Sequence, residues 1–318
     1  MRLIRQLEDF SADLRAGAVA VGNFDGVHRG HARIIRRLVE LARRHGGPAI
    51  AFTFDPPPAA LLRPDRAPPA LTTTERKAEL LARLGVDAIV AFPTSAEFLQ
   101  LSAREFFERV LVGALGARAV VEGPNFFFGR QRRGNVELLQ DFCRQAGIEL
   151  DVVEPLVLHG EIVSSSRIRN HLSQGRVAEA AAILTEPYRV GGSVIHGAGR
   201  GASLGFPTAN LAGVATLLPC EGIYAGRAYV DGRPLAAAIS IGPNPTFDEN
   251  ARKLEVFLLD FDGDLYGQTI DVDFRARLRD VIRFHSVDQL LEQMNRDVQE
   301  TRQIAVPDGP PDHPPAAG

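Results

Sequence analysis

Two histidines stand three positions apart, directly after a short apolar run. The stretch GNFDGVHRGH, residues 22–31, places His28 and His31 where a strand is expected to end and a helix to begin. Backbone N–H groups and the helix dipole at such a point favour an anion. Two imidazoles there would add hydrogen-bond donors for a phosphate on which charge develops during transfer. Either histidine alone would suggest an ordinary capped turn, but the pair favours a phosphate site.

Two stretches contain further predicted nucleotide contacts. In GNFDGVHRGH, glycines let the backbone approach a ligand closely. In SSSRIRN, residues 164–170, hydroxyl groups are combined with guanidinium groups, and arginine is a rigid bidentate donor to phosphate. A serine-rich helix start with surface arginines is the alternative for this second stretch. The predicted contacts are Gly22, Asn23, Phe24, Asp25, Gly30, Ser164, Ser165, Ser166 and Arg169.

A glycine-rich loop in the second half suggests another phosphate site. GAGRGASLGFPTANL, residues 197–211, has spaced glycines whose backbone N–H groups could surround phosphates. The oxygens of Thr208 and Asn210 suit a hard cation such as Mg²⁺. The loop lacks the GK[ST] ending of a P-loop, and on its own it would indicate only a flexible turn. The predicted contacts are Gly199, Gly205, Phe206, Pro207, Thr208 and Asn210, of which the last two are predicted metal ligands.

The first half alternates β-type runs with helical patterns. Strands are predicted at residues 18–22, 49–54, 87–92, 117–122 and 148–153, and helices at 32–45, 74–85, 103–116 and 136–147. Strands that are apolar on both faces, separated by amphipathic helices, indicate a parallel sheet covered on both sides. We therefore predict a doubly wound α/β domain over residues 1–186. Its ligands should lie beyond the carboxyl ends of the strands, where GNFDGVHRGH begins.

The second half changes to short strands with glycine and proline turns. Hairpin signals at VDGRP and FDGD predict antiparallel pairing, and the run as a whole suggests a small β-barrel over residues 187–304. Residues 286–304 predict a closing helix with Ser286 as its N-cap. The proline-rich tail, residues 305–318, is predicted to be disordered.

Composition excludes several functions and leaves others. The 318 residues, 45% of them hydrophobic, can bury two cores. A net charge of -3 argues against general binding to nucleic acid or to an anionic membrane, so phosphate recognition must be local. Two cysteines are too few for a disulfide framework, and no apolar run could span a membrane. We expect a cytoplasmic protein, and homo-oligomer formation stays open.

Together these motifs resemble a known family. GNFDGVHRGH followed by SSSRIR is similar to the adenylyltransferase module of prokaryotic bifunctional riboflavin kinase/FAD synthetases, which belongs to the HxGH nucleotidyltransferase group. GAGRGASLGFPTANL resembles the GxxxGFPTAN signature of the six-stranded riboflavin kinase barrel, and SIGPNPTF and LEVFLLDFDGDLYG follow in the family's order. The resemblance extends to about Arg302. It implies riboflavin, FMN, FAD and ATP as ligands, with Mg²⁺.

The resemblance also assigns roles to single residues. Glu255 lies in a β-type run, where a carboxylate is ordinarily exposed to solvent. The family comparison implies instead that it is the general base, which takes the proton of the ribityl 5′-hydroxyl as this attacks the γ-phosphate of ATP. His28 and His31 are implied as catalytic, and Asn125 as a substrate contact in the loop EGPNFFFGRQRRGN, residues 122–135.

Five positions depart from the family pattern. None carries a group assigned to chemistry, so we expect altered binding contacts and retained activity. The aromatic run at 126–128 is predicted either to stack on the isoalloxazine ring or to pack as a hydrophobic turn. The departures are Phe127 and Asn244 for arginine, Asn135 for an acidic residue, Phe257 for histidine and Ser166 for threonine.

We expect an enzyme with two activities. The C-terminal barrel would phosphorylate riboflavin to FMN with ATP and Mg²⁺, and the N-terminal domain would adenylylate FMN to FAD with release of pyrophosphate. One alternative is a riboflavin kinase whose N-terminal domain is a nucleotide-binding regulator. A flavin-binding sensor without turnover is a second, disfavoured by the histidine pair and Glu255. Nucleotide transfer to another phosphate is a third, disfavoured by fusion to a kinase that supplies the expected substrate.

Overall fold

The chain folds into two compact units. The computed structural model describes residues 1–197, 199–244, 246 and 249–305. One unit comprises Met1–Ser166 and Ile183–Thr185, and the other comprises Arg167–Ala182 and the chain from Glu186 onward. The predicted disordered tail lies outside the described residues except for residue 305, as does the side chain of Asn244. Across the described ranges, no helix is long and apolar enough to cross a membrane.

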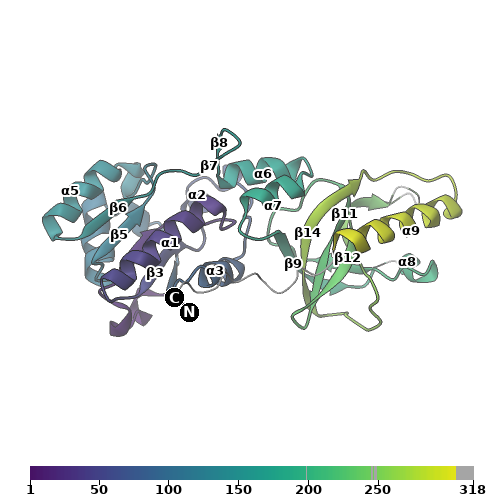
Figure 1. Cartoon of the computed structure of the whole chain (residues 1–318), viewed down its shortest axis with the longest axis horizontal. Coiled ribbons are helices and arrows are strands. Elements are labelled where there is room, and N and C mark those ends of the chain that lie inside the picture. The colour runs from purple at the N-terminus through teal and green to yellow at the C-terminus, as the bar shows by residue number, and fades with distance from the viewer. Residues whose placement is uncertain (198, 245, 247–248, 306–318) are drawn as a thin grey trace, which may run out of the picture. The chain divides into compact units, whose positions relative to one another are not determined.

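A six-stranded parallel sheet forms the centre of the first unit (Figure 1). The strand order is β1-β4-β3-β2-β5-β6, and every neighbouring pair is parallel. All five predicted strands are confirmed, and β1 is an additional edge strand that is too short to give a sequence pattern. The strands are β1 (Arg2–Ile4), β2 (Ala18–Val21), β3 (Ala49–Phe54), β4 (Ala88–Phe92), β5 (Ala119–Glu122) and β6 (Glu149–Val152).

Helices cover both faces of this sheet, as a doubly wound domain requires. Along β2, Ala18 and Ala20 pack with residues of α1 and α3, whereas Val19 and Val21 pack with residues of α4 and α5. This alternation divides the core into two layers, one on each face of the sheet. The helices are α1 (Arg29–Arg44), α2 (Pro58–Leu62), α3 (Thr74–Arg83), α4 (Ala103–Phe106), which continues as a π-helical stretch (Phe107–Ala114), and α5 (Val136–Ala146); a small hairpin of β7 (Val157–Leu158) and β8 (Glu161–Ile162) follows β6.

The winding of the sheet reverses between β2 and β5. From β2 the chain proceeds to β3 and β4 on one side, whereas β5 and β6 lie on the other. Loops that leave the carboxyl ends of β2 and β5 therefore diverge, and a crevice forms between them. The predicted phosphate stretch leaves β2 at Gly22, and the loop with the aromatic run leaves β5 at Gly123.

The second unit is built around a closed antiparallel barrel. Its strands follow the order β10-β13-β12-β11-β14-β9, and every adjacent pair is antiparallel. Helix α9 (Val287–Ile304) begins after Ser286, whose hydroxyl accepts the Gln289 N–H, so the predicted closing helix and its cap are confirmed. The strands are β9 (Tyr188–Ile195), β10 (Ala209–Ala212), β11 (Gly222–Val230), β12 (Arg233–Asn244), β13 (Glu249–Leu258) and β14 (Thr269–Arg279).

Three further helices accompany the barrel sequence. They are α6 (Ser165–Ser173), α7 (Val177–Ile183) and α8 (Arg200–Ser203). The Cys220 N–H donates to the Leu172 carbonyl at 3.0 Å, so most of α6 packs with the second unit. By contacts, therefore, residues 167–182 group with the barrel, although they precede the boundary expected at residue 186. Helix α9 is fastened by the Arg279–Asp297 ion pair at 2.7 Å.

Candidate functional sites

A cavity of about 290 Å³ opens at the carboxyl edge of the parallel sheet. The loop after β2, the start of α1 and the loop after β5 contribute to its wall. The structure thus brings together residues that lie far apart in the sequence, at the switch point between β2 and β5. The predicted site residues on the wall are Gly22, Phe24, His28, Gly30, His31 and Asn125.

The two histidines are arranged as a stacked pair at the N-terminus of α1. His28 is the N-cap residue, and its Nδ1 accepts the backbone N–H of His31 at 3.1 Å. Because Nδ1 is an acceptor, the proton of the neutral His28 ring lies on Nε2. The two ring centroids are 3.5 Å apart, with 15° between the ring planes. The pair therefore occupies one small volume and cannot readily carry two charges.

Burial makes both imidazoles neutral at physiological pH. Burial lowers the pKa of His28 to about 4. It also holds the pKa of His31 well below its usual range, and the nearby His28 and Lys77 lower it further. The Nδ1 atom of His31 is buried and has no hydrogen-bond partner among the described residues. An orphaned ring nitrogen beside a cavity fits a site that is completed by a ligand.

The loop between the histidines and β2 has a strained backbone. Phe24, Gly26 and Val27 have φ values of 45°, 80° and 39°. The left-handed region is unfavourable for a β-branched residue such as Val27, and such conformations cost about 1–3 kcal/mol each. The Thr185 hydroxyl donates to the Val27 carbonyl at 2.8 Å and holds the loop in place. Strain maintained in this way is typical of functional loops.

Several predicted contacts lie behind the loop instead of on the cavity wall. The Asp25 carboxylate accepts the backbone N–H of Leu71 at 2.9 Å, and the Ser165 hydroxyl donates to the Asp25 carbonyl at 2.8 Å. These two residues fix the shape of the loop from outside the cavity. Asn23, Ser164 and Ser166 are likewise absent from the described wall, and Arg169 lies on α6 within the second unit.

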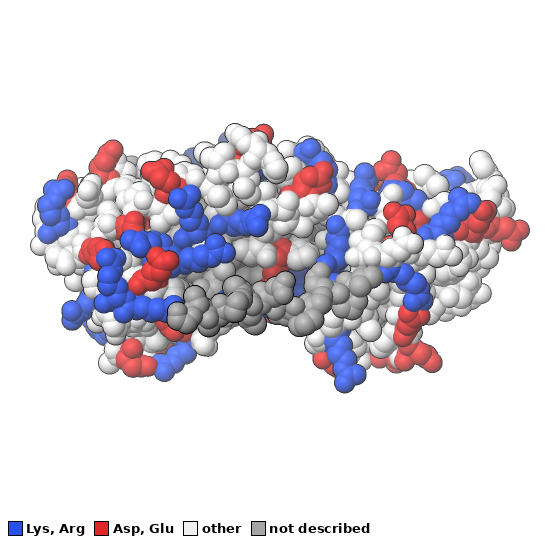
Figure 2. Space-filling model, viewed as in Figure 1, with Lys and Arg blue, Asp and Glu red and all other residues white. Residues whose placement is uncertain are grey.

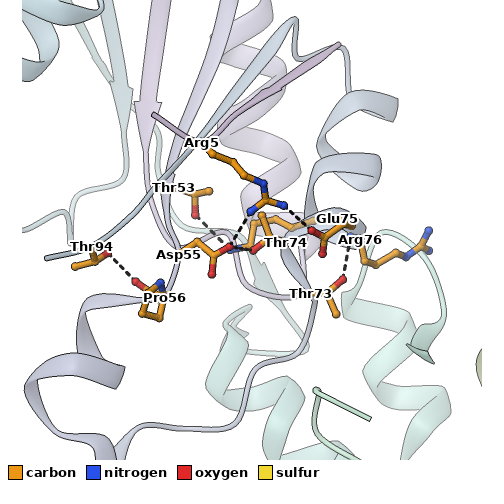
Figure 3. A network of polar contacts seen from close by, with 10 residues as sticks. Arg5, Thr53, Asp55, Pro56, Thr73, Thr74, Glu75, Arg76 and Thr94 are labelled. Carbon is orange, nitrogen blue, oxygen red and sulfur yellow. Dashed lines mark hydrogen bonds and ion pairs between the residues drawn. The ribbon is translucent and has the colours of Figure 1, made fainter. Parts of the chain in front are cut away.

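A polar network holds the end of β3 against the start of α3 (Figure 3). Asp55 accepts the Thr74 hydroxyl at 2.7 Å and lies 3.5 Å from the Arg5 guanidinium. Arg5 also pairs with Glu75 at 2.6 Å. Three elements of the first unit, β1, β3 and α3, are thereby joined near the edge where the cavity opens.

Lys77 places a buried positive charge near the histidines. Its side chain donates to the Thr53 hydroxyl at 3.3 Å, and Thr53 in turn donates to the Asn23 carbonyl at 3.2 Å. Burial lowers the pKa of Lys77, whereas the carboxylates of Asp25 and Asp55 raise it. This lysine lies off the cavity wall, so its hydrogen bonds support the loop after β2 and its charge acts from a distance.

The three phenylalanines of the aromatic run, residues 126–128 in the loop after β5, lie in different environments. Phe126 lines the cavity and stacks on Phe128, with ring centroids 5.3 Å apart, and Phe128 is buried in the core. Phe127 is 45% exposed, beneath the Arg132 guanidinium at 4.7 Å. Asn135, which departs from the family pattern, caps α5 by accepting the Leu138 N–H. Only Phe126 of the run is therefore available at the cavity.

Glu122 lines the cavity but was not among the predicted contacts, although it is the first residue of the stretch EGPNFFFGRQRRGN. Its side chain is only 3% exposed, and its carboxyl accepts the Val21 N–H at 2.7 Å. Burial holds the pKa of this carboxyl well above its usual range. The sequence carries one signal of its role, a carboxylate that ends an otherwise apolar buried strand.

Positive charge gathers over α1 despite the negative net charge of the chain. Figure 2 shows lysine and arginine side chains clustered over this helix, whereas the two signs are mixed elsewhere on the same face. Helix α1 contains six arginines and one acidic residue, Glu40. Arg44 pairs with Glu149 at 2.8 Å, and Arg37 pairs with Asp151. This local excess of arginine, on a helix that begins at the histidine pair, is consistent with the expectation that phosphate recognition is local.

A second cavity, of about 220 Å³, lies in the barrel unit. The glycine-rich loop, the barrel strands and α9 contribute to its wall. Gly205, with φ at 85°, shapes the loop but is not part of the wall. The predicted site residues on the wall are Gly199, Phe206, Pro207, Thr208, Asn210 and Glu255.

Strand register brings the carboxylate of this cavity next to its neutral oxygen donors. Glu255 on β13 is paired with Asn210 on β10 and with Ser240 on β12, and all three residues line the cavity. Glu255 is thus part of the cavity wall and is not an ordinary solvent-exposed strand residue. Phe257 also lines the cavity, with its ring centroid 5.3 Å from that of Phe206.

The glycine-rich loop lies directly over the two predicted metal ligands. A Cβ at Gly197 would come within 2.3 Å of the Asn210 side-chain nitrogen, and one at Gly201 within 3.3 Å of the Thr208 hydroxyl. Among the described residues, no cluster of three or more His, Cys, Asp or Glu could hold a metal ion. Neutral oxygens beneath a phosphate-binding loop fit a hard cation such as Mg²⁺, because this ion is commonly shared with substrate phosphates.

Fold and sites together define a class: an α/β nucleotide-binding unit joined to a small barrel with its own phosphate-type loop. The FAD synthetase family model matches residues 10–167, and the riboflavin kinase family model matches residues 184–305. A bifunctional riboflavin kinase/FMN adenylyltransferase of Pseudomonas fluorescens is 35% identical over 308 residues, covering 96% of this chain and 99% of the relative. The chain belongs to this bifunctional family.

Other comparisons agree in extent. The enzyme of the same name from Escherichia coli K12 is 35% identical over 306 residues, covering 96% of this chain and 98% of the relative. A solved structure described as a macrolide-efflux protein from Streptococcus pneumoniae superimposes with a TM-score of 0.83 at 31% identity, covering 94% of this chain and 98% of that one.

Membership in the family confirms the main functional prediction. The chain carries both a FAD synthetase domain and a riboflavin kinase domain, and its relatives are bifunctional. It is therefore an enzyme of flavin cofactor synthesis that acts on riboflavin, FMN and ATP and forms FAD. The kinase-only alternative loses its support, because the FAD synthetase match covers nearly all of the first unit.

Proposed function

We propose that the two cavities are the two reaction centres. The barrel cavity would convert riboflavin to FMN, and the cavity at the sheet edge would convert FMN to FAD. The observation that carries this assignment is that each family-model match contains one cavity with the residue types that its reaction needs. We place the functional division near residue 186, with the adenylyltransferase in residues 1–186 and the kinase in residues 187–304.

In the kinase centre, Glu255 is the proposed general base. It accepts the proton of the ribityl 5′-hydroxyl while the 5′-oxygen forms a bond to the γ-phosphorus of ATP. The bond from that phosphorus to the bridging oxygen breaks, and ADP leaves. Thr208 and Asn210 would hold Mg²⁺, which neutralises phosphate charge when bound. The glycine-rich loop, with Gly199, Gly205, Phe206 and Pro207, would enclose the phosphates.

In the adenylyltransferase centre, no general base is required. The FMN phosphate is already anionic at neutral pH, and its oxygen attacks the α-phosphorus of ATP while the bond to the β-phosphate breaks and pyrophosphate leaves. His28, through Nε2–H, and His31 would donate hydrogen bonds to the phosphate chain as neutral groups. Asn125 and Phe126 would contact the flavin side.

The remaining predicted residues have supporting roles in this proposal. Gly22, Phe24 and Gly30 shape the wall beside the phosphates, and Asn23, Asp25 and Ser165 hold the loop after β2. Ser164 and Ser166 would contribute donors where α6 begins, and Arg169, which lies on α6 within the second unit, stays a prediction from the sequence motif. We also propose a cytoplasmic location, which the low cysteine count supports, and no nucleic-acid binding, which the net charge of -3 supports.

The test is to assay both steps on the whole chain, with riboflavin or FMN as substrate and ATP with Mg²⁺, and to quantify FMN, FAD and pyrophosphate. His28→Ala should abolish FAD formation and leave FMN formation intact. Glu255→Gln should do the reverse, because glutamine cannot accept the proton. If either variant, while folded, lost both activities, the assignment of one reaction to each cavity would be wrong.

A further inference from the structure

Glu122 is a buried acid at the switch point that neither proposed reaction uses. It is the last residue of β5, next to the end of β2, and it lines the same cavity as His28 and His31. Its carboxyl oxygen Oε1 accepts the Val21 N–H at 2.7 Å, which ties the ends of the two central strands together. The residue therefore stands where the phosphate chain of ATP would enter under the proposed function.

Among the residues that the structure describes, no cation pairs with this carboxyl group. None of the ion pairs among the described residues includes Glu122, and its side chain is 3% exposed. On the strand beside it, the carboxylate of Asp151 is already paired with Arg37 of α1. Glu154, just beyond β6, adds a second acid to the cavity wall.

The histidines that share the wall do not supply the missing charge. Burial lowers the pKa of His28 to about 4 and that of His31 well below its usual range, so both are neutral at pH 7. An ionised Glu122 would therefore be a desolvated anion in a cavity that must admit a polyanion. Burial opposes this by holding the pKa of Glu122 well above its usual range.

We propose that Glu122 is a ligand-contacting residue of the FMN adenylylation site, whose neutral carboxyl group donates a hydrogen bond to a phosphate oxygen of ATP. In this form one oxygen accepts the Val21 N–H and the other carries the proton that is donated. This inference rests on the proposed function of the cavity and adds a specific contact to it.

A purely structural role does not explain Glu122, because a buried acid with a raised pKa lowers the stability of the folded state at neutral pH. Its folded-state pKa is raised, so the stability that it contributes is present below the unfolded pKa near 4.5 and is lost as pH rises through the folded value. At neutral pH the side chain is thus a liability to the fold. A perturbed acid on a cavity wall is accordingly more typical of a functional group than of a core residue.

The experiment compares Glu122→Gln and Glu122→Leu with the wild-type chain. Glutamine keeps an acceptor for Val21 and a donor for the ligand but does not ionise, whereas leucine has neither. Glu149→Gln is the matched control, because Glu149 begins the neighbouring strand β6 at the amino edge of the sheet, away from the cavity, and pairs with Arg44. Riboflavin phosphorylation by the same samples serves as the internal standard, and thermal unfolding checks that each variant is folded.

At pH 7 we expect Glu122→Gln to keep the KM for ATP in FAD synthesis within about threefold of wild type. In folded Glu122→Leu, this KM and the inhibition constant of inorganic pyrophosphate should rise about tenfold or more, with riboflavin phosphorylation unchanged. Wild-type FAD synthesis should decline as pH rises and Glu122 ionises, and Glu122→Gln should lack this decline. Unaltered constants in Glu122→Leu, or identical pH profiles for wild type and Glu122→Gln, would each overturn the inference. A wild-type chain that makes no FAD would instead overturn the proposed function.

Discussion

At the scale of single residues, the adenylyltransferase centre depends on neutral donors and not on cations. The two imidazoles stack at 3.5 Å, and the hydrogen bond from the His31 N–H to His28 fixes the tautomer of His28. A charged pair would be repelled at this distance and would lose hydration on burial. The positive charge that acts on the pair comes instead from buried Lys77. The site is therefore set up for phosphate by the position of the ring proton on neutral His28, more than by a positive charge on the histidines.

This charge state should be visible in the stability of the first unit. The pKa of His28 is lowered from 6.5 to about 4, so the unfolded chain binds more protons between these values. Stability is full above pH 6.5 and falls as pH drops toward 4, by about 3 kcal/mol from His28 alone. His28→Asn keeps a helix N-cap but does not titrate, so its melting temperature should fall less steeply over this range.

Two spectroscopic signals separate the units in this experiment. The chain has no tryptophan, and its four tyrosines all follow residue 186, so tyrosine fluorescence reports only on the second unit. Far-ultraviolet circular dichroism reports on the helices of both. The effect of His28→Asn should appear in circular dichroism and leave the fluorescence transition unchanged. Equal acid sensitivity of both proteins by circular dichroism would contradict a neutral buried His28.

At the scale of elements, the local sequence pattern predicted the strands and helices but not the contacts between distant segments. The five strands and the body of α1 follow from apolar runs and helix periodicity, although α1 begins at Arg29, three residues before the predicted start, and the six-stranded barrel followed from the resemblance. The strain at Val27, the inward position of Glu122 and the outward turn of Asp25 depend on residues distant in the sequence, such as Thr185 and Leu71. Contacts between distant residues produce no periodic pattern in the sequence. Motif spacing could therefore identify GNFDGVHRGH as a site but could not show which of its residues line the cavity.

The glycine-rich loop offers a test of how an element positions a proposed metal ligand. In Gly197→Ala, the new methyl group would meet the Asn210 side chain at 2.3 Å, so Asn210 must move. We expect riboflavin phosphorylation to fall at least tenfold, with weaker dependence on Mg²⁺, because a displaced Asn210 would no longer hold the proposed ion. A tenfold change in rate corresponds to about 1.4 kcal/mol of lost transition-state stabilisation. The measurement is the initial rate of FMN formation against Mg²⁺ concentration.

The control for this substitution is Gly232→Ala, where a Cβ meets nothing within 4 Å. Gly232 has φ at 76°, so this variant should lose some stability while it keeps full kinase activity. FAD formation from added FMN should be unchanged in both variants. A Gly197→Ala chain with wild-type FMN formation would show that the position of Asn210 does not matter for the reaction.

At the scale of the whole molecule, the two centres are built from separate parts of the chain. The wall of the first cavity comes from residues 21–163, and the wall of the second from residues 197–298. No described residue belongs to both walls, and each lies within a single contact unit. Each centre can therefore be inactivated without altering the residues of the other, and FMN links them chemically because it is the product of one reaction and a substrate of the other.

This separation predicts complementation between two inactive chains. Neither His28→Ala nor Glu255→Gln alone should convert riboflavin to FAD, because each lacks one step. A mixture of the two should do so, since FMN formed by the first chain can diffuse to the intact sheet-edge cavity of the second. FAD should appear after a lag during which FMN accumulates, and the lag should shorten as the concentration of the Glu255→Gln chain rises. A mixture that accumulates FMN without forming FAD, although Glu255→Gln alone adenylylates added FMN, would mean that FMN stays bound to the chain that made it and that the two centres are coupled within one molecule.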